Sequence, residues 1–247
     1  MSGLISEFAF NGSSCWRSHS KNKRFNHKIT SNPAHWQGKI DHKNSAQAKC
    51  NLSQNKNHSC SDLLSKNNDD KAITFISENG FREEKSWREL NINTGKIIKF
   101  LKQIKIKKGD RVAAYMPNTI ETVEAFIAAS TIGSIWSSCS PDFGIRGVVE
   151  RFSQINPKVL FVTDQYFYNG KKINILERLP EILKHIPSIK NVVVVNYPGK
   201  RLVKNNEKLK KIKLFKWNEL MQISPEETTF KKFDFENELA ILYSSGT

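Results

Sequence analysis

The spacing of apolar residues changes sharply near residue 71. Residues 1–60 are polar, rich in Asn, Ser, Lys and His, and follow neither a 3.6 nor a 2.0 period, which predicts a leader that is disordered or poorly packed. Residues 71–87, "KAITFISENGFREEKSW", alternate apolar and polar positions on both sides of Asn79-Gly80. This dipeptide tolerates positive φ at both central positions of a turn, so the pattern predicts a β-hairpin. The chain is therefore expected to divide into a leader, residues 1–60, and a folded part, residues 61–247.

Predicted helices and strands alternate after the hairpin. Ser86 and Glu89 have the spacing of a capping box that opens a helix. The apolar face of that helix consists of Leu90, Ile97, Ile98, Leu101 and Ile104. Further predicted strands are 110–116, 134–139, 158–164, 191–195 and 239–243. Further predicted helices are 118–132, capped by Asn118 with Glu121, 143–155, capped by Asp142, and 172–185. Strands of continuous β-branched residues between amphipathic helices indicate a mostly parallel sheet with helices on both faces, an α/β layered fold.

Charge is distributed unevenly along the chain. The formal net charge is +15, but residues 1–60 hold nine Lys or Arg against two Asp or Glu, and residues 200–216 hold eight against one. The remainder is nearly neutral, and 200–216 is expected to be a surface loop whose charges are solvated. A basic protein that binds nucleic acid through these two segments stays open as an alternative, although few aromatic residues interleave with the lysines.

The cysteines, the apolar runs and the first ten residues bear on the expected cellular location of the protein. The four cysteines form no CxxC pair, and the histidines and cysteines of residues 1–60 lack zinc-finger spacing, so reduced thiols in a cytoplasmic protein are expected. The longest weakly polar run, residues 125–136, is far shorter than the roughly 20 residues that span a bilayer. The first ten residues lack the basic n-region of a signal peptide.

The chain ends on a strand that runs into Ser244-Ser245-Gly246-Thr247. In a parallel sheet this places small residues with hydroxyl groups at the carboxyl edge, where such folds bind ligands. Glycine allows close approach to a phosphate, and hydroxyl and N–H groups solvate its oxygens. A plain Ser/Gly turn is the alternative. The Gly-Lys-Ser/Thr of a Walker motif is absent, which argues against a P-loop NTPase.

Several motifs in order resemble one enzyme superfamily. "YSSGT" resembles the start of the phosphate loop of adenylate-forming acyl-CoA synthetases, and residues 86–143, from "SWRELNINTGK" through "GDRVAAYMPN" to "SPDF", resemble their early region. More narrowly, "IWSSCSPDFG", "RFSQINPKVLFVTDQYFYNGKK" and "LAILYSSGT" are similar to acetoacetyl-CoA synthetases (acetoacetate–CoA ligases). The resemblance covers about residues 62–247. It implies that residues 61–247 form part of an AMP-binding domain, truncated within the phosphate loop.

The resemblance implies a reaction in two halves, with ATP, Mg²⁺ and CoA as ligands. A carboxylate attacks the α-phosphorus of ATP and expels pyrophosphate, and the CoA thiol then attacks the acyl-adenylate. Ser244, Ser245, Gly246 and Thr247 are expected at the ATP phosphates. The magnesium ligand and the catalytic lysine are expected beyond Thr247, so the chain alone is predicted to be an inactive fragment.

The resemblance also implies a CoA site at Trp136, Ser137, Ser138 and Lys171. The alternatives are that Trp136 is an ordinary core residue and Lys171 a solvated helix start. Cys139 is expected to be a small structural residue rather than a nucleophile, because no His or Lys lies beside it in the sequence.

Three questions stay open from the sequence. Residues before Asp62 depart from the superfamily pattern, so either the leader is unusual or the reading frame upstream of about Ser61 is wrong, and the second is favoured. Another short-chain acyl-CoA synthetase remains an alternative to the acetoacetate enzyme. The nucleic-acid-binding protein is the alternative from a different class.

Overall fold

A five-stranded parallel sheet forms the centre of the protein. In the computed structural model the described residues are 66–197, 212–226, 233 and 237–243. The strands of the sheet are β3 (Arg111–Tyr115), β4 (Ile135–Cys139), β5 (Val159–Thr163), β8 (Asn191–Val195) and β9 (Lys213–Lys216). Their order across the sheet is β4-β3-β5-β8-β9, and every neighbouring pair is parallel. The predicted α/β layered fold is confirmed.

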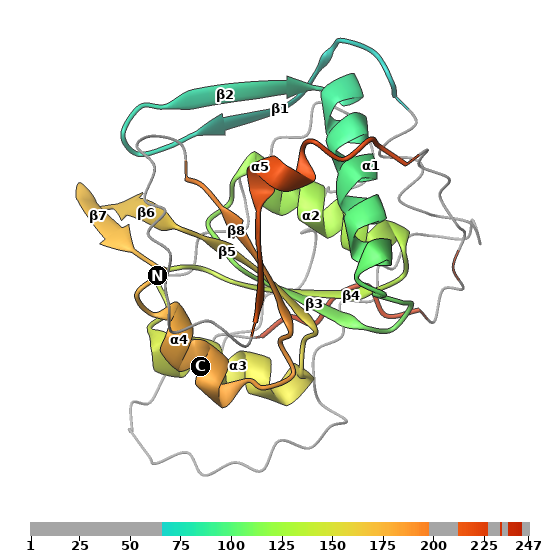
Figure 1. Ribbon diagram of the computed structural model, residues 1–247. Coiled ribbons are helices and arrows are strands. Elements are labelled where there is room, and N and C mark those ends of the chain that lie inside the picture. The colour runs from blue at the N-terminus through green and yellow to red at the C-terminus, as the bar shows by residue number, and fades with distance from the viewer. Residues whose placement is uncertain (1–65, 198–211, 227–232, 234–236, 244–247) are drawn as a thin grey trace, which may run out of the picture.

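Helices cover both faces of this sheet (Figure 1). On one face lie α1 (Trp87–Gln103), α2 (Ile120–Thr131) and the short α5 (Trp217–Leu220). On the other face lie α3 (Ile145–Ile155) and α4 (Leu179–His185). Because β3 and β5 are buried on both faces, their side chains are apolar almost throughout.

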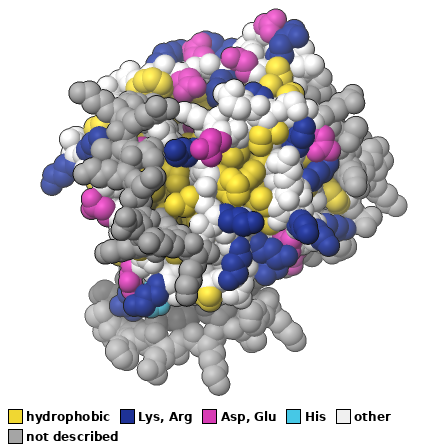
Figure 2. Space-filling view, viewed as in Figure 1, with side chains coloured by type: hydrophobic (Ala, Val, Ile, Leu, Met, Phe, Trp, Pro, Cys, Tyr) yellow, Lys and Arg dark blue, Asp and Glu magenta, His cyan; other side chains and the backbone are white. Residues whose placement is uncertain are grey.

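Strands β1 (Lys71–Ile76) and β2 (Arg82–Ser86) form the predicted antiparallel hairpin. It lies above α1 and α2 in Figure 1. Its turn differs from the expected one, because Gly80 alone has a positive φ, 80°, and Asn79 does not. Ser77 N–H donates to the Phe81 carbonyl at 2.9 Å, which closes a longer loop than a two-residue turn. The charged side chains of both signs at the top of the molecule in Figure 2 belong to this region, where Glu84 pairs with Arg82 at 2.5 Å.

Helix α1 begins at the predicted capping box. The Ser86 hydroxyl accepts from the Glu89 N–H at 3.3 Å, and the Glu89 carboxylate accepts from the Ser86 N–H at 2.8 Å, so two otherwise unpaired backbone donors are satisfied. The predicted apolar face is buried, apart from Ile104, which is the partly buried C-cap.

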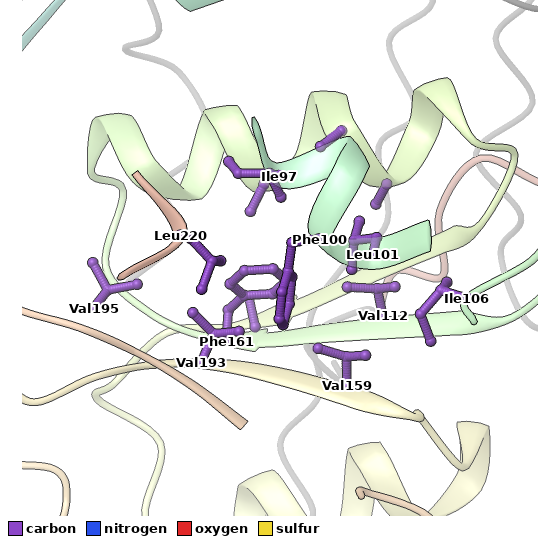
Figure 3. Close-up of a cluster of buried hydrophobic side chains, with 14 of the residues drawn as sticks. Ile97, Phe100, Leu101, Ile106, Val112, Val159, Phe161, Val193, Val195 and Leu220 are labelled. Carbon is purple, nitrogen blue, oxygen red and sulfur yellow. The ribbon is translucent and has the colours of Figure 1, made fainter. Parts of the chain in front are cut away.

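The core between α1 and the sheet is closely packed (Figure 3). Ile97, Phe100 and Leu101 of α1 and Leu220 of α5 point toward the strands. The strand residues that they meet are Val112, Val159, Phe161, Val193 and Val195. Each fully buried side chain of this size contributes about 2 kcal/mol, which makes this layer the main source of stability on that face.

The caps of α2 and α3 differ from the predicted ones. Helix α2 has Thr119 as its N-cap, not Asn118, because Thr119 still has extended backbone angles (φ −90°, ψ 170°) and the helix begins at Ile120. Thr122 Oγ1 donates to the Pro117 carbonyl at 2.7 Å. Helix α3 begins at Ile145 with Gly144 as its N-cap, so the prediction for Asp142 is wrong.

Residues 165–174 form a hairpin, not the start of the predicted helix 172–185. Strands β6 (Gln165–Tyr168) and β7 (Lys171–Asn174) pair across Asn169 and Gly170, whose φ values are 49° and 69°. Positive φ at both positions is what a two-residue hairpin turn requires, and residues 172–174 then pair with β6 instead of entering a helix. Helix α4 starts only at Leu179, with Pro180 in its first turn, where a missing N–H is tolerated.

The segment 200–216 is not a surface loop throughout. Residues 200–211 lie outside the described residues, but Lys213–Lys216 is strand β9, which pairs with β8 and is followed at once by α5. The chain then crosses α1, where Glu226 N–H donates to the Gly95 carbonyl at 3.3 Å and Lys99 Nζ donates to Ser224 Oγ at 2.7 Å. A Cβ on Gly95 would lie 2.6 Å from the Glu226 carbonyl oxygen, so only glycine allows this crossing.

Candidate functional site at the carboxyl edge of the sheet

The strand order places a change of direction between β3 and the central strand β5. From β3 the chain moves to β4 on one side, and from β5 it moves to β8 on the other. In open α/β sheets, ligands bind outside the carboxyl ends of the strands at such a point. The side chains that follow Tyr115 and Thr163 are therefore the first candidates for a site.

Tyr115 and Arg178 form a polar network at this edge. The buried Tyr115 hydroxyl donates to the Phe143 carbonyl at 2.6 Å, with the Pro141 carbonyl 3.2 Å away. Arg178 Nη1 donates to the Tyr115 hydroxyl at 2.9 Å and reaches the Pro141 carbonyl at 3.1 Å. Burial raises the pKa of Tyr115, although Arg178 opposes the shift, so the hydroxyl stays protonated as a donor. The network joins β3, the β4–α3 loop and α4.

Asp142 belongs to the same edge but does not cap a helix. Its Oδ1 accepts from the Tyr166 hydroxyl at 2.8 Å, and its Oδ2 accepts from Ser140 Oγ at 2.8 Å. Burial, reinforced by Asp142, raises the pKa of Tyr166 well above its usual range. Asp142 therefore fastens the β6–β7 hairpin to the loop after β4.

Asp164 joins the ends of β5 and β8. Its Oδ1 accepts from the Tyr197 N–H at 2.8 Å, and its carbonyl accepts from the Ile175 N–H at 3.0 Å. The residue is fully buried, so it serves as a fixed link between two strand ends.

The three predicted CoA residues on β4 have different environments. Trp136 is 5% exposed and packs against Phe126 and Phe161 in the core, with ring centroids 5.9 and 6.4 Å away. Ser137 is fully buried, and its hydroxyl donates to the Ile241 carbonyl at 2.9 Å. Ser138 is exposed. Trp136 and Ser137 thus lie behind the surface, and Ser138 lies on it.

Lys171 is exposed at the start of β7, directly opposite Tyr168. It comes from a hairpin strand, not from the helix start that the alternative assumed. The β6–β7 hairpin projects beyond the carboxyl end of the sheet in Figure 1, away from β4.

The segment before the predicted phosphate loop runs along the outer side of β4. The Trp136 N–H donates to the Leu239 carbonyl at 3.0 Å, and the Ile241 N–H donates to the Trp136 carbonyl at 2.8 Å. The predicted last strand, 239–243, is thus reduced to an isolated parallel bridge between Trp136 and Ala240. Ser244, Ser245, Gly246 and Thr247 lie outside the described residues.

Neither a reactive thiol nor a metal cluster is found in the described part of the chain. Cys139 is buried, and burial raises the pKa of its thiol to about 11, which suits the predicted structural role. Across residues 66–197, 212–226, 233 and 237–243, no three His, Cys, Asp or Glu side chains lie close enough to hold a metal ion. The same residues include no helix long and apolar enough to cross a membrane.

Sequence reasoning missed Tyr115, Tyr166, Arg178 and Tyr243 as members of this edge. Tyr115 could have been found, because a polar group at the last position of a buried parallel strand lies at the ligand-binding edge. Arg178 could not, since residues 172–185 were predicted to be one helix, and Tyr166 lies in a segment for which no element was predicted.

Comparisons with known proteins place residues 62–247 in one enzyme family. A family model described as AMP-binding enzyme matches residues 62–247. Acetoacetyl-CoA synthetase from Gallus gallus is 37% identical over 194 residues, which cover 75% of this chain and 28% of that protein. Acetoacetyl-coenzyme A synthetase from Rhizobium meliloti is 34% identical over 201 residues, covering 81% of this chain and 29% of the other. Malonamoyl-CoA synthetase vrtB from Penicillium aethiopicum is 33% identical, covering 72% and 25%.

A solved structure has the same fold. Acetoacetyl-CoA synthetase from Streptomyces lividans superposes with a TM-score of 0.68 at 27% identity, over 77% of this chain and 29% of that one. The chain therefore spans less than a third of the length of the relatives that it matches.

Proposed function

Because the chain belongs to the AMP-binding enzyme family over residues 62–247, we propose that it forms part of an ATP-dependent acid–CoA ligase that activates acetoacetate. The observation that carries the proposal is the agreement among relatives. Proteins named acetoacetyl-CoA synthetase from a bird and a bacterium match about three quarters of the chain or more at 34–37% identity. A solved structure with that name has the same fold.

In this proposal the ATP phosphates bind at Ser244, Ser245, Gly246 and Thr247. A carboxylate oxygen of the acid attacks the α-phosphorus and pyrophosphate leaves, and the CoA thiol then attacks the acyl carbon and AMP leaves. Hydroxyl and backbone N–H groups of such a loop neutralise charge on the phosphoryl oxygens while they hold the triphosphate in line. Mg²⁺ would accompany ATP, but the described residues offer no acidic cluster for it, so no step is assigned to the metal.

For CoA, we propose that Ser138 and Lys171 are the contacting members of the predicted set. Both side chains are exposed, whereas Trp136 and Ser137 are buried. The Lys171 ammonium suits a phosphate of the CoA nucleotide as a point charge. A reducing, cytoplasmic setting is part of the proposal, in keeping with the free thiol of Cys139.

The test is acid-dependent exchange of pyrophosphate into ATP. The 247-residue chain and a protein extended past Thr247 to the length of the relatives are assayed with acetoacetate, acetate, propionate and malonamate. The extended protein is expected to prefer acetoacetate, and the shorter chain to be inactive. Preference for malonamate or acetate would show that the substrate is another short acid and not acetoacetate. Malonamate is included because the Penicillium aethiopicum relative is named malonamoyl-CoA synthetase. Comparable turnover by the 247-residue chain would contradict the predicted inactivity.

We propose no nucleic-acid partner. Part of the basic segment 200–216 is built into strand β9, and Lys213 and Lys216 flank the apolar pair Leu214-Phe215 in that strand. A DNA titration at increasing salt tests this point. Tight binding that falls steeply with salt would favour the nucleic-acid alternative instead.

A further inference from the structure

Residues 239–243 are held along the outer side of β4 by more than backbone pairing. Two backbone hydrogen bonds join this segment to Trp136, and the Ser137 hydroxyl adds a third bond, donated to the Ile241 carbonyl at 2.9 Å. Ser137 is fully buried and Ile241 is partly exposed, so this bond is partly shielded from water. It links residues that are 104 positions apart in the sequence.

Tyr243 provides a second anchor, on helix α3. Its hydroxyl donates to the Arg151 carbonyl at 2.6 Å, and the Arg151 guanidinium lies 5.8 Å from the Tyr243 ring centroid. The same guanidinium lies 4.1 Å from the Phe143 ring centroid, and its Nη1 donates to the Gly147 carbonyl at 2.9 Å. Burial, with Cys139 nearby, raises the pKa of Tyr243 to about 12 despite Arg151, so the hydroxyl remains a donor at neutral pH.

The two anchors act directly before the predicted phosphate loop. Ser244 follows Tyr243 in the sequence, and four residues of extended chain reach at most about 14 Å. Any phosphate that the backbone of Ser244–Thr247 binds must therefore lie within about 17 Å of the Tyr243 Cα, which is the reach of the chain plus one hydrogen bond of about 3 Å. The isolated bridge between Trp136 and Ala240 would by itself constrain the path of this segment only weakly. The bonds to β4 and to α3 constrain residues 241–243 from two sides.

We propose that Ser137 and Tyr243 are positioning residues for the phosphate loop. Neither is a catalytic residue: they hold Ile241–Tyr243 between β4 and α3, so that Ser244 leaves from a fixed point at the carboxyl edge of the sheet. This inference rests on the proposed function and deepens it. It also gives Ser137 a role other than contact with CoA, because its hydroxyl is already bonded to Ile241.

The test uses Ser137→Ala and Tyr243→Phe, each of which removes one hydroxyl. Ser134→Ala and Tyr197→Phe are the matched controls. Ser134 is a buried serine bonded to the Ala129 carbonyl, and Tyr197 is a buried tyrosine that packs against Phe75 and Phe167.

The first measurement is amide exchange in the 247-residue chain at Ile241, whose N–H donates to the Trp136 carbonyl at 2.8 Å. We expect exchange at least tenfold faster in the two test variants and unchanged in the controls. Equal exchange in test and control variants overturns the proposal.

The second measurement is ATP–pyrophosphate exchange in the extended protein. We expect KM for ATP to rise at least fivefold in both test variants, with KM for acetoacetate within twofold of the unsubstituted protein and with thermal midpoints matching those of the controls. Unchanged KM for ATP, or a loss that follows thermal stability in test and control variants alike, overturns the proposal. If the unsubstituted extended protein shows no exchange with acetoacetate, the proposed function fails, and amide exchange alone then decides whether the anchor exists.

Discussion

A buried carboxyl group between α2 and the hairpin should make the stability of this protein depend on pH. Glu124 of α2 is 0% exposed. Its Oε1 accepts from Lys85 Nζ at 3.2 Å and from Asn93 Nδ2 at 2.9 Å, whereas its Oε2 has no hydrogen-bond partner within the described residues. The carboxylate is thus half satisfied in a place that water does not reach.

The change in the free energy of unfolding with pH follows from the shift in the pKa of Glu124. Burial raises the pKa of Glu124 from 4.5 to about 7, although Lys85 and Asn93 oppose the shift. Lys85 is less deeply buried, and although burial lowers its pKa, the carboxylates around it, Glu124 foremost, raise it overall. The folded state therefore holds the Glu124 proton more tightly than the unfolded chain does. Between pH 4.5 and pH 7 the free energy of unfolding should fall by about 3 kcal/mol from this group alone.

Glu124→Gln removes the charge and keeps the shape, and the amide oxygen can still accept from Lys85 and Asn93. At pH 8 the variant should be more stable than the unsubstituted protein by about 3 kcal/mol, and near pH 4 the two should be equal. The assay is urea unfolding at pH 4, 6 and 8, followed by the fluorescence of the buried tryptophans Trp87, Trp136 and Trp217.

The matched control is Glu150→Gln, which alters an exposed carboxylate paired with Arg146 and should leave the pH dependence as it is. Parallel stability curves for Glu124→Gln and the unsubstituted protein, or a variant less stable at pH 8, would refute the reasoning. The second outcome would mean that the attraction of Lys85 exceeds the cost of burying the charge.

Three further predictions concern packing, the carboxyl edge and the buried thiol. Gly95→Ala should lower the free energy of unfolding by about 1–3 kcal/mol in urea titrations, because the added Cβ would lie 2.6 Å from the Glu226 carbonyl oxygen. An unchanged unfolding midpoint would show that the segment around Glu226 can move away from α1 at no cost. Arg178→Ala should cost about 1–2 kcal/mol in the same assay, because the Tyr115 hydroxyl loses its donor, and Arg178→Lys should restore only part of the loss. Cys139 should be alkylated by iodoacetamide at pH 8 only after denaturation, because its thiol is buried and the pKa of the thiol is raised to about 11. Peptide mapping would locate the label, and labelling of Cys139 in the native protein would contradict its burial.

The sequence alone was sufficient where local chemistry and periodicity agree. The capping box of Ser86 and Glu89 depends on residues three positions apart, so tertiary contacts need not decide it. The apolar runs of β5 and β8 identify buried parallel strands, because only a sheet covered on both faces makes such runs favourable. The resemblance that led to the AMP-binding family rests on motifs that can be read in order along the chain.

The sequence misled where a local signal was ambiguous. Residues 172–185 have enough apolar positions for a helix, yet Asn169-Gly170 makes a hairpin turn and Pro180 confines the helix to residues from Leu179 onward. Strand β9 was hidden within a run of lysines, since an edge strand needs few apolar residues and its alternation is too short to stand out.

The candidate site divides in the same way. From the sequence came the small residues Ser244–Thr247 and their expected place at the end of a strand, because the carboxyl ends of parallel strands share one edge. Tertiary structure alone decided that the Ser137 hydroxyl is bonded to Ile241 rather than open to a ligand, and that Tyr243 reaches the carbonyl of Arg151. These contacts join residues roughly a hundred positions apart, and no periodicity or local propensity carries information over that distance. Only the packing of β4, α3 and the last described segment against one another brings them within hydrogen-bond reach.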